Sequence, residues 1–332
     1  MLRLDHKLAS IREGNFRPTD FVIADAKDGD MGSGVAYTGL DHTLLGRPRR
    51  RSRQEFIAHT EAIIRQDIVD IMLVSASNLE LLQARGAFDG TSVKPAIRAN
   101  DTTDTWGGIR HGVYASLPSK PFRTLRFYRA TATDLGLYSI TFLNDRDADA
   151  AALDAFAVFR AEAAAAGFKY FYEVFNPNVT GLVPQKAGEF VNDCILRSLA
   201  GVTKADRPQF LKVTFNGPRA LEELASFDSE LIVGVLGGAA GTTRDTFELI
   251  AQAQRFGARV ALFGRKINVA EAPLELIRLM RAVADGDVTP REAVRAYHEA
   301  LKAAKIAPVR SFEDDARITE YALFSGALDQ AA

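Results

Sequence analysis

Residues 231–263 read LIVGVLGGAAGTTRDTFELIAQAQRFGARVALF and decide the fold of the chain. The segment opens with an apolar run, Leu231–Leu236, which predicts a strand and is followed by a glycine-rich turn. Thr243–Phe256 then has the apolar spacing of an amphipathic helix, with Gly257 where a helix C-cap belongs. A second apolar run, Val260–Phe263, follows. Because neither run alternates with polar residues, we expect two strands of a parallel sheet that is covered on both faces.

The same strand–helix unit recurs along the chain. Six further apolar runs, most of them followed by helical patterns, predict strands at Phe21–Asp25, Val69–Ser75, Lys94–Ala99, Tyr138–Leu143, Lys169–Phe175 and Phe210–Phe215. Eight strands alternating with helices favour a (β/α)8 TIM barrel over an open doubly wound sheet. The open sheet is less favoured because no Gly-x-Gly-x-x-Gly follows the first strand.

Helix boundary signals support this interpretation. Ser52 and Glu55 form a capping-box pair ahead of a helix over Arg53–Gln66. An alanine-rich helix over Asp154–Ala165 ends just before Gly167. In the connection 100–133, which is rich in Gly, Pro and Arg, the sequence does not place a helix.

The chain is longer than the about 250 residues that a barrel needs. The surplus predicts a leading helix near Asp5–Glu13, within residues 1–14, and a helical extension over 289–332. In the extension, Thr289 as N-cap, Pro290 and Glu292 mark the start of a helix. Without a linker or a low-complexity tract, we expect one domain over residues 1–332.

The composition is that of a globular protein. Of 332 residues, 47% are hydrophobic and 25% are charged, so bulk disorder is not expected. The 41 Lys and Arg residues balance the 42 Asp and Glu residues, and this gives no general attraction to nucleic acid or anionic membranes. The single cysteine, Cys194, excludes an intramolecular disulfide framework. Neither a secretory signal nor an apolar run of about 18 residues is present, so we expect a cytoplasmic protein.

In a barrel the chemistry lies at the carboxyl ends of the strands. This rule turns the predicted strands into a set of candidate site residues: Asp25, Lys27, Asp28, Arg98, Asn100, Asp101, Asn144, Asp145, Glu173, Asn176, Lys212, Thr214, Asn216, Gly237, Gly238, Gly264, Arg265 and Lys266.

Lys212 is the most informative of these residues. In Phe210–Phe215 it alternates with aliphatic neighbours, so it points into the barrel if the aliphatic set faces the helices. A desolvated interior lowers the pKa of a lysine amine and frees a nucleophile for a carbonyl carbon. The alternative is a lysine that only pairs with a neighbouring carboxylate. Glu173 lies equally deep in the preceding strand, about 4.8 Å away across the sheet, where it can shuttle protons or act as that counter-ion.

An anion site is expected where the last two strands end. The loop 237–243 is built of small residues and precedes a helix, so backbone N–H groups and the helix N-terminus favour a phosphate. Gly264, Arg265 and Lys266 follow the last strand and add cationic partners. The alternative is a plain turn.

Several of these residues together resemble a known family. Leu211-Lys212-Val213, Leu231–Gly241 and Ala258–Lys266 look like strands six to eight of class I, Schiff-base aldolases of the tagatose-bisphosphate and archaeal fructose-bisphosphate type. The resemblance is best over residues 170–301. It implies that Lys212 forms an imine with the substrate ketone, that Glu173 transfers protons and that Asp25 orients hydroxyls or the amine. It also implies a phosphate held by Gly237, Gly238, Gly264 and Arg265. Arg98 stands where the tagatose type has a lysine, and with Lys27 and Asn216 it completes the expected substrate contacts.

Other residues of the sequence bear on metal binding and surface charge. The five histidines are scattered and none lies in a predicted strand, so a zinc site is not expected. Asp25, Asp28 and Asp30 could bind Mg²⁺ or Ca²⁺, but Lys27 interrupts the calcium-loop pattern. The prediction is therefore an enzyme without a metal or a cofactor. The basic run Arg47–Arg53 is either a solvated loop or an attractor of anionic groups. Trp106 either covers the substrate or packs locally.

The sequence thus predicts a class I aldolase, an aldehyde-lyase that acts on a phosphorylated ketose. The alternatives are a sugar-phosphate isomerase or epimerase that works without an imine, and a non-catalytic sugar-phosphate binder. The expected partner is a small phosphorylated sugar, without nucleic acid or membrane. The sugar, a sulfonate analogue of it and self-association into a homo-oligomer stay open.

Overall fold

The computed structural model describes residues 2–41, 49–129, 132–179, 181–238 and 241–327. Eight parallel strands close into a barrel, so the predicted (β/α)8 fold is confirmed. Around the barrel the strands follow the order β1 (Val22–Ala26), β12 (Val260–Phe263), β11 (Gly234–Leu236), β10 (Leu211–Val213), β9 (Lys169–Phe175), β8 (Leu135–Thr141), β5 (Lys94–Arg98) and β4 (Ile71–Val74). The sequence placed β9 and β12 to the residue and the ends of the other strands within three residues.

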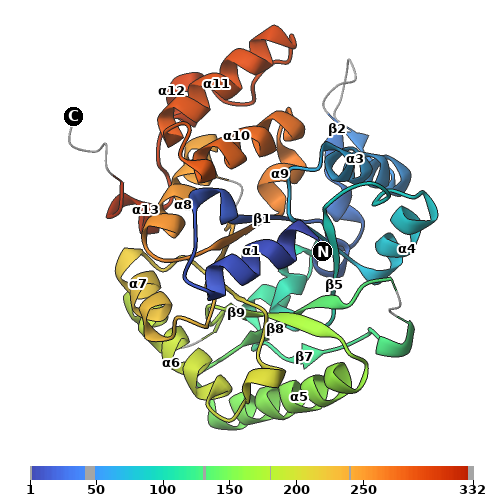
Figure 1. The fold of residues 1–332 in the computed structure, drawn as a ribbon, viewed down its shortest axis with the longest axis vertical. Coiled ribbons are helices and arrows are strands. Elements are labelled where there is room, and N and C mark those ends of the chain that lie inside the picture. The colour runs from blue at the N-terminus through green and yellow to red at the C-terminus, as the bar shows by residue number, and fades with distance from the viewer. Residues whose placement is uncertain (1, 42–48, 130–131, 180, 239–240, 328–332) are drawn as a thin grey trace.

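Helices surround the barrel (Figure 1). They are α1 (Arg3–Arg12), α2 (Asp30–Ser33), α3 (Arg53–Gln66), α4 (Ala76–Ala84), α5 (Arg146–Ala165), α6 (Ala187–Leu199), α7 (Pro218–Phe227), α8 (Thr243–Arg255), α9 (Arg265–Val269), α10 (Pro273–Asp285), α11 (Pro290–Ala303), α12 (Phe312–Asp315) and α13 (Tyr321–Phe324). The helices α1 and α11–α13 correspond to the predicted leading helix and C-terminal extension. The helix α5 begins earlier than predicted because Asp145 caps it, accepting hydrogen bonds from the backbone N–H groups of Asp147 and Ala148.

Two short hairpins lie in the connections after β1 and β5. One pairs β2 (Leu40–Asp41) with β3 (Arg49–Arg50), and the other pairs β6 (Asp101–Thr102) with β7 (Pro121–Phe122). Among the described residues between β5 and β8, 3-10 turns and this second hairpin stand in place of a crossover helix. This explains why helical periodicity was missing there.

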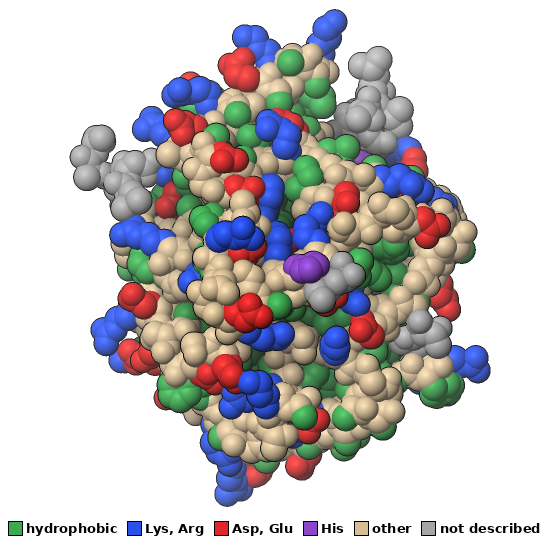
Figure 2. All heavy atoms as spheres, viewed as in Figure 1, with side chains coloured by type: hydrophobic (Ala, Val, Ile, Leu, Met, Phe, Trp, Pro, Cys, Tyr) green, Lys and Arg blue, Asp and Glu red, His purple; other side chains and the backbone are tan. Residues whose placement is uncertain are grey.

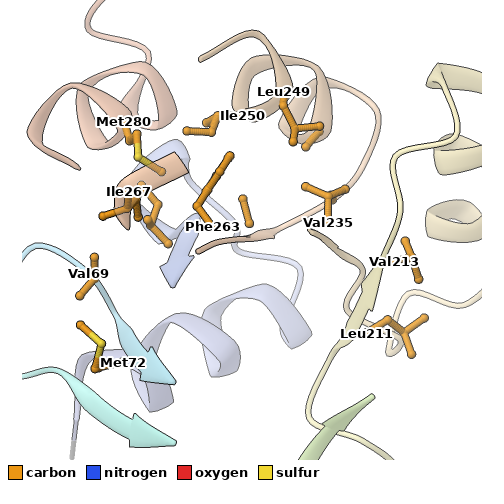
Figure 3. Close-up of a cluster of buried hydrophobic side chains, with 14 of the residues drawn as sticks. Val69, Met72, Leu211, Val213, Val235, Leu249, Ile250, Phe263, Ile267 and Met280 are labelled. Atoms are coloured by element: carbon orange, nitrogen blue, oxygen red, sulfur yellow. The ribbon is translucent and has the colours of Figure 1, made fainter. Parts of the chain in front are cut away.

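The hydrophobic core has two layers, one on each face of the strands. Outside the barrel, Val235 and Phe263 face Leu249 and Ile250 of α8 (Figure 3). Inside it, aliphatic side chains such as Val22 on neighbouring strands meet in a second cluster. Each strand therefore contributes alternate residues to each layer, as the period of two requires.

The helix α1 closes the amino-terminal end of the barrel, and in Figure 1 it crosses the ring of strands. Leu4 and Leu8 of α1 are buried against the inner cluster. The carboxylate of Asp70 fixes the helix in place, because it accepts hydrogen bonds from Arg3 Nε (2.7 Å) and Lys7 Nζ (3.0 Å). Among the described residues, α1 therefore covers the amino-terminal end of the barrel interior.

The face that carries α1 shows Lys and Arg side chains interspersed with Asp and Glu (Figure 2). This agrees with the near-zero net charge of the chain. Within the described ranges, none of the helices combines the length and apolar character needed to cross a bilayer.

The start of α11 gives a stability prediction. Thr289 Oγ1 accepts a hydrogen bond from Glu292 N (3.3 Å), and Thr289 N donates to Glu292 Oε2 (2.8 Å), which is the predicted capping box. Thr289→Ala should lower the free energy of unfolding by about 1 kcal/mol. Thr289→Ser keeps the hydroxyl and is the control. Urea unfolding of both variants measures the difference, and an equal loss in both would contradict the capping role.

Candidate active site

A layer of polar side chains lies inside the barrel, closer to the carboxyl ends of the strands than the inner apolar cluster. Lys212 of β10 is the register partner of Glu173 of β9, and Glu173 is also the register partner of Ser139 of β8. All three alternate with side chains of the outer core, such as Tyr172 and Leu211, so all three point inward. The inward placement of Lys212 that the sequence predicts is therefore present in the structure.

Lys212 and Glu173 form a buried ion pair. Lys212 Nζ lies 2.5 Å from Glu173 Oε1, and the two residues are only 6% and 1% exposed. The other carboxylate oxygen, Oε2, accepts hydrogen bonds from Ser139 Oγ (2.6 Å) and Arg98 Nη2 (3.4 Å). These two donors fix the carboxylate, so Oε1 faces the lysine at a distance suited to proton transfer.

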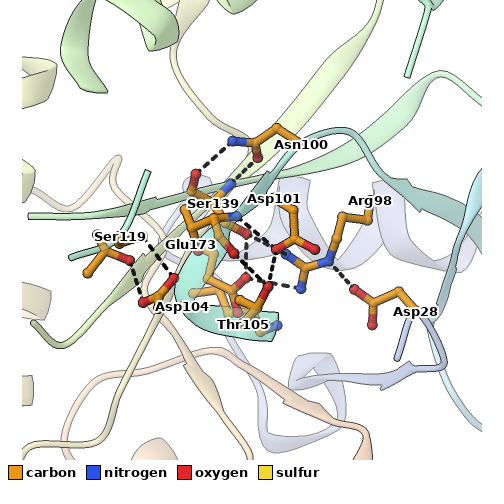
Figure 4. A network of polar contacts seen from close by, with 12 residues as sticks. Asp28, Arg98, Asn100, Asp101, Asp104, Thr105, Ser119, Ser139 and Glu173 are labelled. Carbon is orange, nitrogen blue, oxygen red and sulfur yellow. Dashed lines mark hydrogen bonds and ion pairs between the residues drawn. The ribbon is translucent and has the colours of Figure 1, made fainter. Parts of the chain in front are cut away.

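Arg98 is the centre of the network (Figure 4). Its Nε donates to Asp28 Oδ2 (2.5 Å), and its Nη1 donates to Ser139 Oγ (2.8 Å) and Asp101 Oδ1 (3.3 Å). With the bond to Glu173, one guanidinium joins three carboxylates. Burial alone would lower the pKa of Arg98, but these three carboxylates raise it instead. Arg98 is therefore a permanent cation that holds the layer together.

Asp28, rather than Asp25, belongs to this cluster. Burial would raise the pKa of Asp28, but Arg98 and Lys212 lower it, so the carboxylate stays ionised. Asp25 lies between its register partners Met72 and Phe263, whose side chains belong to the outer core. Its own side chain therefore points towards the helices.

Asp25 pairs with Lys27 outside the barrel interior. The distance from Lys27 Nζ to Asp25 Oδ2 is 3.3 Å, and both side chains are buried. Burial raises the pKa of Asp25 to about 6, which Lys27 partly opposes. The same burial lowers the pKa of Lys27. Among the described residues no hydrogen bond or ion pair joins this pair to the Lys212 cluster, although the nearby charge of Asp28 also raises the pKa of Asp25. The expected roles of Asp25 and Lys27 stay predictions.

The raised pKa of Asp25 predicts a pH dependence of stability. A carboxyl whose pKa is higher in the folded state stabilises the fold most below its unfolded pKa of about 3.9. This contribution is lost as the pH rises through about 6. The stability of Asp25→Asn relative to the wild type should therefore rise between these pH values and then level off. Urea unfolding from pH 4 to 8 measures the difference, and a difference independent of pH would contradict it.

The asparagines in the predicted set have structural partners. Asn100 Nδ2 donates to the carbonyl oxygen of Ser139 (2.8 Å), and Ser139 N donates to Asn100 Oδ1 (2.5 Å), so Asn100 extends the pairing of β5 with β8. Asn216 forms reciprocal side-chain hydrogen bonds with Asn176, at 2.7 and 3.0 Å. This pair joins the loops that follow β9 and β10.

At the glycine-rich edge, a hydrogen bond joins two of the four residues expected to hold a phosphate. Arg265 Nη2 donates to the carbonyl oxygen of Gly238 (2.8 Å), and Gly238 has a φ of +60°. A Cβ at Gly237 would lie 2.4 Å from the ring of Phe263, so that position requires glycine. Gly264 packs against β1, where a Cβ would lie 2.6 Å from the carbonyl oxygen of Ala26.

The N-terminus of α8 is already occupied by the chain's own groups. Thr243 N donates to Asp315 Oδ1 (2.7 Å), and Asp245 N donates to Thr242 Oγ1 (3.0 Å). Residues 239–240 of the predicted phosphate loop lie outside the described residues. An anion at this edge would thus rely on Gly238 and Arg265 rather than on the end of α8.

The basic run and Trp106 have local partners. Arg47 lies outside the described residues. Arg49 pairs with Glu55, and Arg53 Nε donates to Asn78 Oδ1 (2.9 Å). Trp106 packs against Tyr114 and Phe122, with ring centroids 5.1 and 4.9 Å away, which favours the local packing role.

Sequence reasoning placed Asp28 and Asp101 at strand ends but did not single them out, and it missed Ser139. The signal for Ser139 was a polar residue at an inward position of the apolar segment Leu135–Thr141. In the described part of the chain, no three His, Cys, Asp or Glu side chains gather as a metal-ligand set.

Comparison with known proteins supports the fold. No family model matches the chain, and no curated protein matches it in sequence. Among solved structures, an archaeal fructose 1,6-bisphosphate aldolase is 15% identical, with a TM-score of 0.62 over 85% of this chain and 99% of its own. A second archaeal fructose-1,6-bisphosphate aldolase, with its catalytic lysine covalently bound to the carbinolamine intermediate of the substrate, is also 15% identical. It has a TM-score of 0.61 over 85% of this chain and all (100%) of its own.

A fructose-bisphosphate aldolase from Slackia heliotrinireducens is 12% identical, with a TM-score of 0.61 over 90% of both chains. These similarities, at such low identity, concern the fold. The chain therefore has the (β/α)8 fold of the archaeal-type fructose-bisphosphate aldolases, and the resemblance predicted from the sequence is confirmed at that level.

Proposed function

We propose that the protein is a class I aldolase that cleaves or forms a phosphorylated ketose through a Schiff base on Lys212. The observation that carries the proposal is the buried pair of Lys212 and Glu173 at the centre of the barrel, 2.5 Å apart. A lysine with a carboxylate as proton acceptor beside it has what imine formation requires. The fold shared with aldolases supports the same assignment.

The proposed chemistry starts with transfer of the ammonium proton of Lys212 to Glu173. The free amine then attacks the ketone carbon of the substrate and forms a carbinolamine. Glu173 returns its proton to the carbinolamine oxygen, which leaves as water and gives the iminium ion. The iminium then serves as the electron sink for cleavage of the carbon–carbon bond.

The proposed substrate places its phosphate at the edge formed by Gly237, Gly238, Gly264 and Arg265. This edge lies at the ends of β11 and β12, the usual phosphate location in such barrels.

Borohydride trapping tests the proposal. The protein is incubated with fructose 1,6-bisphosphate, tagatose 1,6-bisphosphate or fructose 1-phosphate and then reduced. Peptide mass spectrometry should find a covalent adduct on Lys212 with the ketose that the protein cleaves. Cleavage of a ketose without such an adduct would reject the imine.

A further inference from the structure

The three carboxylates around Arg98 differ in how their oxygens are used. Glu173 has both oxygens bonded, to Lys212 on one side and to Ser139 and Arg98 on the other. Asp28 holds Arg98 Nε at 2.5 Å. Asp101 is different, because its Oδ2 is buried and has no hydrogen-bond partner among the described residues.

The free oxygen of Asp101 is held in a fixed position. Its other oxygen, Oδ1, accepts hydrogen bonds from Thr105 Oγ1 (2.6 Å) and Thr102 N (2.9 Å). It also lies 3.3 Å from Arg98 Nη1. The side chain is only 1% exposed, so its carboxylate cannot turn to water for a donor. An unpartnered acceptor this deeply buried is costly unless a ligand supplies the missing donor.

Arg98 places Asp101 opposite the reactive pair. The Nη2 atom of Arg98 contacts Glu173, whereas its Nη1 atom contacts Asp101 (Figure 4). One rigid guanidinium therefore separates the carboxylate beside Lys212 from the carboxylate with the free oxygen. Because both carboxylates bind the same guanidinium, Asp101 lies beside the cluster that contains Lys212.

We propose that Asp101 is the base that accepts the proton of the substrate hydroxyl when the carbon–carbon bond breaks. This inference rests on the proposed function, because the step needs the iminium on Lys212. It gives the two carboxylates separate tasks. Glu173 serves formation of the imine, and Asp101 serves the cleavage that follows.

The step balances as follows. The O–H bond at carbon 4 of the ketose breaks, and its proton goes to Asp101 Oδ2. The electrons of that O–H bond form the C=O bond of the leaving aldehyde. The electrons of the bond between carbons 3 and 4 move to the iminium and give an enamine on Lys212. The neutral Asp101 then returns its proton to carbon 3 of the enamine.

The ionisation of Asp101 suits this role. Burial raises the pKa of Asp101 to about 6, although Arg98 opposes the shift. At neutral pH the group is therefore mostly ionised and ready to accept a proton, and its conjugate acid is strong enough to return it. Asp28 suits the role less well, because Arg98 and Lys212 lower its pKa.

The test separates imine formation from bond cleavage. The probe is one ketose from the trapping panel. It is the ketose that gives both an intact six-carbon adduct and a three-carbon adduct with the wild type. In Asp101→Asn, borohydride should trap the intact ketose on Lys212 in normal yield. The three-carbon adduct should disappear, and the cleavage rate should fall about 10²–10⁴-fold.

Two further variants make the result decisive. Asp101→Glu keeps the charge beside Arg98 but displaces the free oxygen, so it should also retain the intact adduct and lose cleavage. Asp104→Asn is the control, because it changes a carboxylate in the same connection. The oxygens of Asp104 accept hydrogen bonds from Ser119 and Thr141, and the cleavage rate of this variant should fall far less than that of Asp101→Asn. Cleavage at the wild-type rate in folded Asp101→Asn, or loss of its intact adduct, would overturn the inference. Absence of any adduct in an active wild type would instead reject the proposed function.

Discussion

Replacing Lys212 with Met should abolish borohydride trapping and lower the rate of ketose cleavage by about 10⁴-fold or more, the size of loss seen when a nucleophile is removed. The thioether of Met fills much of the volume of the lysine chain but cannot attack a carbonyl carbon. Trapping followed by peptide mass spectrometry, together with steady-state kinetics, measures both effects.

A second substitution separates chemistry from stability. Lys212→Met leaves Glu173 buried without its cation, which destabilises the fold on its own. Lys212→Arg keeps a cation beside Glu173 but has no nucleophilic amine. We therefore expect Lys212→Arg to unfold closer to the wild type and yet to be equally inactive. Retained turnover of a sugar phosphate in either variant would favour an isomerase or epimerase without an imine.

The barrel could be predicted from the sequence because its determinants are local. The apolar segment Lys169–Phe175 and the segment Val260–Phe263 were placed to the residue as β9 and β12. Capping at Ser52 and Thr289 was also readable, because each cap and its Glu partner lie three residues apart. The β6–β7 hairpin was not, since nothing local shows that Thr102 pairs with Pro121.

Strand alternation predicts the part of the site that lies within the strands. Alternation turned Lys212 and Glu173 inward, and their contact follows from the neighbouring strands. The roles of Arg98 and Asp101 depend on side chains that meet across the barrel, which the sequence does not show. The resemblance implies a role for Asp25 and none for Asp28, since only the structure shows that Asp28 reaches Arg98 inside the barrel.

Besides the loss of Lys212, replacing Arg98 with Met should be the substitution in this network that lowers the stability and the cleavage rate most. Three buried carboxylates, those of Asp28, Asp101 and Glu173, would lose their common cation. Removing one partner of a buried ion pair costs about 3–5 kcal/mol of the free energy of unfolding. Cleavage should fall as well, because Glu173 would lose one of the two donors that fix its position.

The loss of stability in Arg98→Met should depend on pH in a characteristic way. Arg98 helps to keep the pKa of Asp28 below its usual value, so its stabilisation is present above that value and is lost as the pH falls through the lowered pKa. The difference in stability between the wild type and Arg98→Met should therefore stay large from neutral pH down to about 4 and shrink only at lower pH, where Asp28 becomes protonated.

A lysine at position 98 is the matched control for charge. It keeps a cation, but a single ammonium cannot bridge three carboxylates as the forked guanidinium does. Arg98→Lys should therefore lose less stability than Arg98→Met and show a weaker dependence on pH. Urea unfolding of both variants between pH 2 and 7 measures this order. If Arg98→Met were as stable as the wild type at neutral pH, the guanidinium could not be what holds the three carboxylates together, and the separate tasks assigned to Glu173 and Asp101 would lose their structural basis.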